Sequence, residues 1–435
     1  MAKIEYLILG GGITGLSLAY HLKGQEYALY EMENRVGGMC RTENVAGFLF
    51  DYGEHFVRAD DEYVRRLLRK LLKENLCSQD LNAAVHLRGQ LVNYPFQTNL
   101  YGLPPDIVKK CLVGYVEAWC KREKNKGKVS NFEQWIYATF GDGIARYFMI
   151  PYNDKIWTGY PRYMTTDWFF SESVVPEGSL EQVIEGAVRK RAIEKRVRWY
   201  PLEGGIEALP RSFLRFVKNV HLDKKAIEID SSRKKITFED GEVVYYRYLL
   251  NTIPLPELTR IVSDVPSDIK KAADSLKFNS VYCVNIGVKR SNLSDRHWIY
   301  FPEKKYVFAR VYFLSNFSPS AAPEGTSSVS ALITYAKWRP IVKEKILERV
   351  LHDLKEASIL RDNDKVITSS ILDMKYGFNI YTHDRAKNVE AIRSHLLANN
   401  IYTLGRYGNW EYSGIEHSIL SSKEFVQSFH GDSAL

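Results

Sequence analysis

The first residues of the chain have the spacing of a dinucleotide-binding turn. Gly10, Gly12 and Gly15 follow one apolar run, and Glu31 ends the next. In a strand–turn–helix–strand unit, the first glycine permits a tight turn, the second lets the backbone approach a pyrophosphate, and the third brings the helix close to the strand. The free N–H groups of the helix then face phosphate, and the acid accepts hydrogen bonds from ribose hydroxyls. We therefore expect a bound dinucleotide rather than an ordinary glycine-rich loop.

More glycines lie where they could approach the same ligand. Gly37 and Gly38 follow the second strand, with Arg41 shortly after them, and Gly405 and Arg406 follow a late apolar run. Paired glycines let the backbone pass close to a bound cofactor. Arg41 could contact the phosphate of that cofactor. An NAD dehydrogenase would continue instead with regular strand–helix units.

The elements that position these residues indicate an α/β fold with a Rossmann-like domain built from separated segments. Strand-like runs occur over 216–254 and 280–335, whereas helical periodicity dominates 57–195. A chain of 435 residues is long enough for two or three interleaved domains. We expect a nucleotide-binding domain from 1–95, 200–280 and 390–435, a helical insertion over 96–199, and a mixed or antiparallel substrate-side sheet over 281–389.

Composition excludes several other classes of protein. The five cysteines are scattered and form no CxxC pair, so we expect no metal site, no disulfide framework and a cytoplasmic location. No apolar run is long enough to span a bilayer. The net charge of +8 suits an anionic ligand, although general surface chemistry also explains it. We expect no nucleic-acid partner, and a homo-oligomer stays open.

A basic cluster over 189–198 stands out in the charge pattern. We expect it on a solvated helix face, with phosphate or membrane binding as the alternative.

The glycine loops, Arg41 and the late Gly405–Arg406 pair together resemble FAD proteins of the glutathione-reductase-like and amine-oxidase-like group. The strands that end at Pro254 resemble the middle section of that group, in which Ala226 would pass the adenine. The resemblance implies FAD as the cofactor rather than NAD alone.

Five further stretches occur in order along nearly the whole chain: 94–99, 148–157, 298–302, Arg310 with 315–319, and 405–412 with 417–418. They resemble the UDP-galactopyranose mutase family, and its eukaryotic branch more closely than its bacterial one. In that family the N5 atom of reduced FAD is the nucleophile that attacks the anomeric carbon of a sugar. The resemblance therefore implies a mutase that interconverts the pyranose and furanose forms of a nucleotide sugar.

The same resemblance implies a set of site residues. Those for the substrate are Phe96, Gln97, Asn153, Trp157, Tyr300, Arg310 and Tyr412. The first two would hold the uracil, the next two would complete the nucleoside pocket, and the last three would bind the diphosphate. Those with catalytic roles are His55, Arg310 and Arg406. Arg406 would stabilise the reduced flavin, and His55 would lie beside it. Taken without the resemblance, Trp157 and His55 are more often structural residues.

The chain departs from the family pattern at two positions that affect chemistry. Glu172 or Ser173 stands where the family has a second diphosphate arginine, and we expect weaker diphosphate binding unless Arg146 or Arg162 compensates. Glu54 stands where the family has a glycine before its histidine. A glutamate restricts the backbone there and would place an acid or base beside the flavin.

Two other functions stay open from the sequence. A flavin oxidoreductase of the amine-oxidase-like or protoporphyrinogen-oxidase-like type needs the same cofactor residues, and the two departures favour it. A degenerate homologue that binds FAD or nucleotide without turnover is the third alternative. The mutase is favoured because the 94–99 stretch, Asn153, Trp157 and Arg310 would serve no purpose with an apolar substrate.

Overall fold

The glycine-rich start of the chain folds into the strand–turn–helix–strand unit that its pattern predicts. The computed structural model describes residues 3–125, 129–169, 175–192 and 195–431. Strand β1 (Ile4–Leu9) leads into helix α1 (Ile13–His21) and returns as β2 (Tyr27–Tyr30). β1 lies between β2 and β12 (Val243–Asn251), and both pairings are parallel. This buried parallel core is typical of nucleotide-binding sheets.

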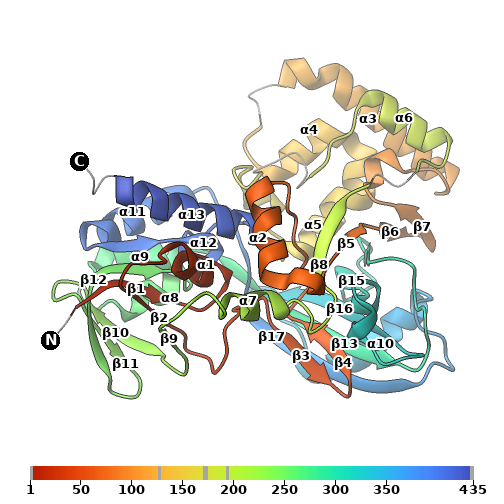
Figure 1. Ribbon diagram of the computed structural model, residues 1–435. Coiled ribbons are helices and arrows are strands. Elements are labelled where there is room, and N and C mark those ends of the chain that lie inside the picture. The colour runs from red at the N-terminus through yellow and green to blue at the C-terminus, as the bar shows by residue number, and fades with distance from the viewer. Residues whose placement is uncertain (1–2, 126–128, 170–174, 193–194, 432–435) are drawn as a thin grey trace.

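Distant segments complete this first sheet. β9 (Val220–His221) pairs in parallel with β2, and β18 (Ile401–Thr403) pairs in parallel with β12. β10 (Ala226–Asp230) and β11 (Lys235–Phe238) extend the other edge as antiparallel strands. The C-terminal helix α13 (Ile415–Gly431) packs on α1, where the Ser422 hydroxyl donates to the Thr14 carbonyl oxygen (3.2 Å). Residues from both ends of the chain therefore form one domain face (Figure 1).

The second sheet is mixed and mainly antiparallel. Its order is β17 (Val366–Asn379), β13 (Phe278–Val288), β16 (Ser327–Tyr335), β15 (Arg310–Tyr312), β14 (Trp298–Tyr300), β6 (Ala83–Leu87) and β7 (Gln90–Asn93). Only β14 and β6 pair in parallel among these described strands. Helix α10 (Ile346–Glu356) buries its apolar side in the core of this sheet. The expected α/β class with a second, mixed sheet is confirmed.

One part of the expected domain division differs from the structure. β6 and β7 lie within 1–95, which we assigned to the nucleotide-binding domain, yet they pair with β14 in the second sheet. The pattern of short strands does not reveal which sheet a strand joins, because that choice depends on distant partners. The other boundaries stay predictions.

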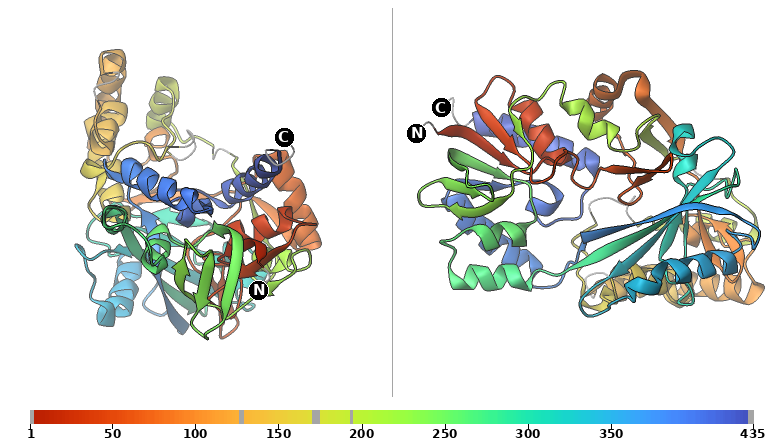
Figure 2. Two further views of the ribbon diagram at one scale, coloured as in Figure 1. Left: turned by 90° about the vertical axis from the view of Figure 1, so that its left-hand side faces the viewer. Right: turned by 90° about the horizontal axis from the view of Figure 1, so that it is seen from below.

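Helices α3 (Pro105–Asn125), α4 (Phe132–Ile144), α5 (Ile150–Ile156) and α6 (Leu180–Val188) stand beside the second sheet (Figures 1 and 2). α3 and α4 approach closely, since a Cβ on Gly141 would lie 1.9 Å from the carbonyl oxygen of Gly114. None of the helices in the described part of the chain is long and apolar enough to cross a membrane.

Shorter elements connect these layers. They are β3 (Thr42–Val45), β4 (Phe48–Asp51), α2 (Glu62–Leu72), β5 (Leu76–Asp80), β8 (Val197–Pro201), α7 (Ala208–Phe213), α8 (Leu255–Ile261), α9 (Ser267–Ser275), α11 (Arg385–Ala398) and α12 (Gly405–Gly408). Helix α2 shows why such segments fold locally. The Asp61 carboxylate accepts hydrogen bonds from two N–H groups of its first turn, and five apolar side chains on one stripe are buried.

Candidate active site

Two glycine loops meet without side chains between them. Gly10 has φ +105°, and a Cβ there would lie 2.5 Å from Oγ1 of Thr252. A Cβ on Gly15 would lie 1.9 Å from the carbonyl oxygen of Gly10, so only glycine lets α1 start this close to β1. The second loop docks through a hydrogen bond from the Gly37 N–H to the Gly11 carbonyl oxygen (2.9 Å). The N-cap of α1 is a glycine without a side-chain cap, so its first N–H groups are available for phosphate.

Gly12 and Gly38 form the close contact between these loops. A Cβ on Gly38 would lie 3.2 Å from the Cα of Gly12, and Gly12 forms an isolated parallel bridge with Gly37. The pair that the sequence singled out therefore lies against the first glycine turn. Side chains at either position would fill the space between the loops.

Glu31 lies at the end of β2 beside the glycine turn. Its carboxylate accepts hydrogen bonds from the N–H groups of Gly11 (2.5 Å) and Glu33 (2.9 Å), and burial raises its pKa. The Lys224 N–H donates to the Glu31 carbonyl oxygen (2.8 Å), which places the start of β10, and with it Ala226, near the same edge. These residues therefore surround one end of the first sheet, as an adenosine site requires.

The side chain of Arg41, near the second glycine loop, has one N–H group that forms no hydrogen bond within the protein. Its guanidinium lies 4.7 Å from the centre of the Tyr52 ring and pairs with Glu33 at 3.4 Å. Its Nε atom is buried without a hydrogen-bond partner. A buried unpaired donor is unfavourable unless a ligand supplies an acceptor.

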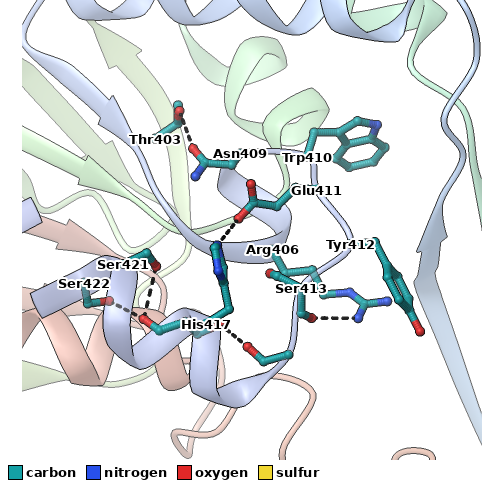
Figure 3. Close-up of polar contacts among 12 residues, drawn as sticks. Thr403, Arg406, Asn409, Trp410, Glu411, Tyr412, Ser413, His417, Ser421 and Ser422 are labelled. Carbon is teal, nitrogen blue, oxygen red and sulfur yellow. Dashed lines mark hydrogen bonds and ion pairs between the residues drawn. The ribbon is translucent and has the colours of Figure 1, made fainter. Parts of the chain in front are cut away.

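The turn after β18 brings a second arginine to the first turn of α1. Gly405 has φ +72°, and a Cβ there would lie 2.2 Å from Oγ1 of Thr14. The Arg406 guanidinium donates to the carbonyl oxygen of Ser413 (3.0 Å) and lies beside the Tyr412 ring (Figure 3), 4.8 Å from its centre. It also donates to the carbonyl oxygen of Gly377 (3.1 Å). Its Nε atom is also buried and unpaired.

His55 lies within electrostatic reach of Arg406. Burial, and then the charge of Arg406, lower the pKa of His55 to about 4. The ring is therefore neutral at physiological pH, and its Nδ1 atom is buried without a hydrogen-bond partner. His55 and Arg406 thus present unused polar atoms to the same region, as residues beside a flavin would.

Arg310 lies in a group of tyrosines on the second sheet. It projects from β15, directly opposite Tyr300 of β14, and its guanidinium carbon is 5.2 Å from the centre of the Tyr300 ring. The rings of Tyr94 and Tyr152 lie 4.8 and 5.1 Å from that of Tyr300. Burial raises the pKa of Tyr152 and of Tyr300, so both phenols keep their protons and can donate to an anion.

The charge of Arg310 is already paired. Its Nη1 contacts Oε1 of Glu54, and the two side chains are only 13% and 10% exposed. Although burial opposes the charged form, the Glu54 carboxylate raises the pKa of Arg310 above its usual value. The Nε atom of Arg310 is nevertheless buried without a partner. Sequence reasoning singled out both residues, but not their contact.

The four residues expected to hold the nucleoside are buried and engaged with one another or with the backbone. The Trp157 indole donates to the side-chain oxygen of Asn153 (3.0 Å), one turn away on α5, and the Asn153 amide donates to the Met149 carbonyl oxygen (2.7 Å). Phe96 stacks on Phe148 at 5.0 Å. The Gln97 amide donates to the carbonyl oxygen of Pro176.

These residues still reach the tyrosine group. Phe148 stacks on Tyr152, which lies against Tyr300, and the Trp157 ring is 6.0 Å from that of Tyr412. Ring contacts therefore connect Phe96 with Tyr300, whose ring lies beside Arg310, and Trp157 with Tyr412. Asn153 contacts Trp157, and Gln97 contacts the backbone of Pro176. Their roles in binding stay predictions.

The expected substitute for the missing diphosphate arginine is not found. Arg146 pairs with Asp142 and Arg162 with Glu133, and the two arginines are 69% and 66% exposed. Both guanidinium groups are therefore largely in solvent and already paired with a carboxylate. Glu172 and Ser173 lie outside the described residues.

Two residues near the site were not found from the sequence. Tyr152 lies within the 148–157 stretch but was given no role of its own, and its contact with Tyr300 places it near Arg310. Arg198 was expected on a solvated helix face, which is wrong: it lies on β8, which pairs with β5, and its guanidinium carbon is 5.2 Å from the Phe56 ring centre. Burial and then the charge of Arg58 lower the pKa of Arg198. The alternation around Trp199 was the missed signal for a strand.

Lys155 fixes the connection between β14 and β15. Its ammonium group donates to the carbonyl oxygens of Phe301 (2.9 Å), Glu303 (2.6 Å) and Phe308 (2.9 Å). Burial lowers its pKa to about 7. Lys155 therefore positions the two strands that carry Tyr300 and Arg310.

A comparison with family models defines the class of protein. The chain belongs to the flavin containing amine oxidoreductase family, whose model matches residues 13–424. The cradle fits a flavin dinucleotide, since it combines two side-chain-free loops with buried, unpaired polar atoms on Arg41, His55 and Arg406. No group of residues that could hold a metal ion occurs among the described residues.

The structure is also similar to a crystal structure of reduced UDP-galactopyranose mutase. The TM-score is 0.92 at 27% sequence identity, and the match covers 100% of this chain and 95% of that chain. The resemblance to this mutase family is thus confirmed. Among curated proteins, coproporphyrinogen III oxidase of Mycobacterium leprae is 35% identical over 114 residues, and UDP-galactopyranose mutase of Mycoplasma pneumoniae is 31% identical over 78 residues. These matches cover 25% and 17% of this chain and only 24% and 20% of the relatives.

Proposed function

We propose that this chain is an FAD-dependent mutase that interconverts the pyranose and furanose forms of a nucleotide sugar. The observation that carries the proposal is the position of Arg310, whose buried guanidinium has an unused Nε donor and lies beside the Tyr300 ring. The protein that holds it is similar over its full length to UDP-galactopyranose mutase. A guanidinium in such surroundings matches a phosphate group. An oxidase of apolar substrates has no use for it.

In this proposal the first sheet holds the cofactor. The N–H groups of α1 face the pyrophosphate, Glu31 accepts from the ribose, and Arg41 contacts a phosphate oxygen. Ala226 borders the adenine, and Arg406 stabilises the negative charge of the reduced flavin. When bound in its reduced form, FAD supplies the nucleophile for the anomeric carbon of the sugar.

The second sheet and the helices hold the substrate. Arg310, Tyr300 and Tyr412 bind the diphosphate that leaves and returns, so the leaving group keeps a charged and hydrogen-bonded partner throughout. Phe96 and Gln97 hold the base, with Asn153 and Trp157 beside them. His55 stays neutral next to the flavin and therefore adds no second positive charge to the Arg406 side.

A flavin oxidoreductase is the second candidate, and one observation favours it. Glu54 already neutralises Arg310, and the surrounding wall is aromatic, which would suit an uncharged substrate. The partial relative from Mycobacterium leprae is an oxidase of a porphyrinogen.

Both candidates can be tested on the purified flavoprotein. UDP-galactose is incubated with enzyme reduced by dithionite, and the UDP-sugars are separated by anion-exchange chromatography. The mutase proposal predicts a furanose product and thermal stabilisation by UDP. If UDP-sugars neither convert nor stabilise the protein, while an amine or a porphyrinogen reduces the flavin, the oxidoreductase is correct.

An Arg310→Ala variant links the activity to the proposed site. We expect it to lose UDP binding while keeping the yellow flavin, because Arg310 lies on the second sheet and not in the glycine cradle. Arg146→Ala is the matched control, since Arg146 is exposed and paired with Asp142. Equal loss of binding in both variants would contradict the assignment.

A further inference from the structure

Glu54 places a carboxylate on the guanidinium that the proposed function reserves for the diphosphate. The pair joins the loop after β4 to β15, and both side chains are nearly buried. With Glu54 in place, the Glu54–Arg310 pair carries no net charge; without it, Arg310 would contribute one positive charge. A nucleoside diphosphate presents at least two negative charges to this region.

The Glu54 carboxylate is held by little else. No other described residue forms an ion pair or hydrogen bond with it, whereas buried Glu31 accepts two backbone N–H groups and Asp51 accepts three donors. The residue follows Gly53, whose φ of +96° marks a turn in the loop. The contact with Arg310 is therefore the main polar contact that holds this side chain among the described residues.

The negative charge of Glu54 also acts on the residues around Arg310. Burial, and to a lesser degree Glu54, raises the pKa of Tyr152 and of Cys283, the latter to about 12. Any anion that enters beside Arg310 meets the same repulsion while Glu54 remains. Only a ligand that brings more charge than one carboxylate gains by displacing it.

We propose that Glu54 is the residue that determines which ligand charge this site accepts: it is an internal anion that a diphosphate displaces from Arg310, and that monoanionic and neutral ligands do not displace. The inference rests on the proposed function, since it takes Arg310 as the diphosphate residue. It assigns to Glu54 a role in selectivity rather than in bond breaking. The unused Nε donor of Arg310 is the first contact available to the incoming anion.

The test measures ligand affinity of the oxidised holoenzyme by calorimetry. Glu54→Gln keeps the shape and an acceptor for Arg310 but removes the charge. We expect UDP and inorganic pyrophosphate to bind about tenfold more tightly or better, which corresponds to about 1.4 kcal/mol. Uridine, which carries no phosphate, should bind equally to both proteins. Glu257→Gln is the matched control, because Glu257 is also a paired glutamate, with Arg260 at 2.9 Å, but lies on α8.

A second variant, Glu54→Gly, keeps the test possible if Glu54→Gln does not fold. Glu54→Gly removes the side chain, so that water can reach Arg310, and should also tighten pyrophosphate binding. Unchanged or weaker binding of pyrophosphate to the folded variants would overturn the inference. If UDP binds no form of the protein while pyrophosphate binding tightens, the proposed function fails and the role of Glu54 stands. If wild-type enzyme converts UDP-galactose but neither variant binds pyrophosphate more tightly, the proposed function stands and the role of Glu54 fails.

Discussion

The Glu54–Arg310 pair should show the energetics of a desolvated ion pair. With 10% and 13% of their side chains exposed, each group depends on the other for charge compensation. Glu54→Gln alone leaves a buried guanidinium without an opposite charge, and Arg310→Gln alone leaves a buried carboxylate without one. Each change should lower the free energy of unfolding by about 3–5 kcal/mol. The double variant retains two amides that can bond to each other and should lose only about 1–2 kcal/mol.

The prediction is measured as a double-mutant cycle. Urea unfolding of the four holoproteins, followed by far-ultraviolet circular dichroism, gives the free energies. The losses of the two single variants then sum to about 6 kcal/mol or more, so the coupling between the two sites should be at least about 4 kcal/mol. Arg146 and Asp142 provide the control cycle: they form an ion pair at 2.6 Å but are 69% and 60% exposed. Their coupling should not exceed about 0.5 kcal/mol.

A coupling between Glu54 and Arg310 as small as that of the exposed control pair would refute the reasoning. Effects that simply add indicate that solvent or another group compensates each charge. The displacement of Glu54 by a diphosphate would then lose its physical basis, because Arg310 would not depend on its partner.

Three further predictions follow from single residues. Gly15→Ala should abolish flavin binding, since its Cβ would lie 1.9 Å from the carbonyl oxygen of Gly10; a normal ratio of flavin absorbance to protein would contradict this. His55 has a pKa of about 4 in the folded protein, below the ordinary value of 6.5. Its neutral form therefore contributes about 3 kcal/mol to the free energy of unfolding above pH 6.5, and this contribution is lost as the pH falls through 4. Urea unfolding across this range should show that slope in the wild type and not in His55→Gln. Lys155→Met leaves three carbonyl oxygens without their donor and should lower the free energy of unfolding by about 3 kcal/mol. It should also weaken UDP binding, because the strand that carries Arg310 shifts. Unaltered UDP affinity would show that Lys155 does not position Arg310.

The sequence by itself determined the cofactor end of this protein. The spacing of Gly10, Gly12 and Gly15 predicts a tight turn, which requires glycine at Gly10 and Gly15, and Glu31 follows one strand later. These constraints act between neighbours within one strand–turn–helix–strand unit, so a short stretch of sequence is enough to recognise them. The α/β class and the mixed second sheet followed from periodicity for the same reason.

Pairing between distant segments was decided only by the tertiary structure. β6 and β7 join the second sheet because β14 lies beside them, and β8 is a strand because β5 pairs with it. Neither segment alone indicates the strand with which it pairs, because hydrophobic periodicity and strand propensity predict a strand but not its neighbour in the sheet. The half-buried place of Arg198 follows from that pairing and not from its charged surroundings in the sequence.

The same limit applies to the chemistry of the site. The sequence singled out Arg310 as a diphosphate residue and Glu54 as a departure, but it treated them as separate facts. Folding places them in contact, from a loop after β4 and from a strand of the second sheet, and burial makes each the charge partner of the other. Whether an arginine is free for a ligand depends on what lies against it, and that is a property of packing rather than of spacing along the chain.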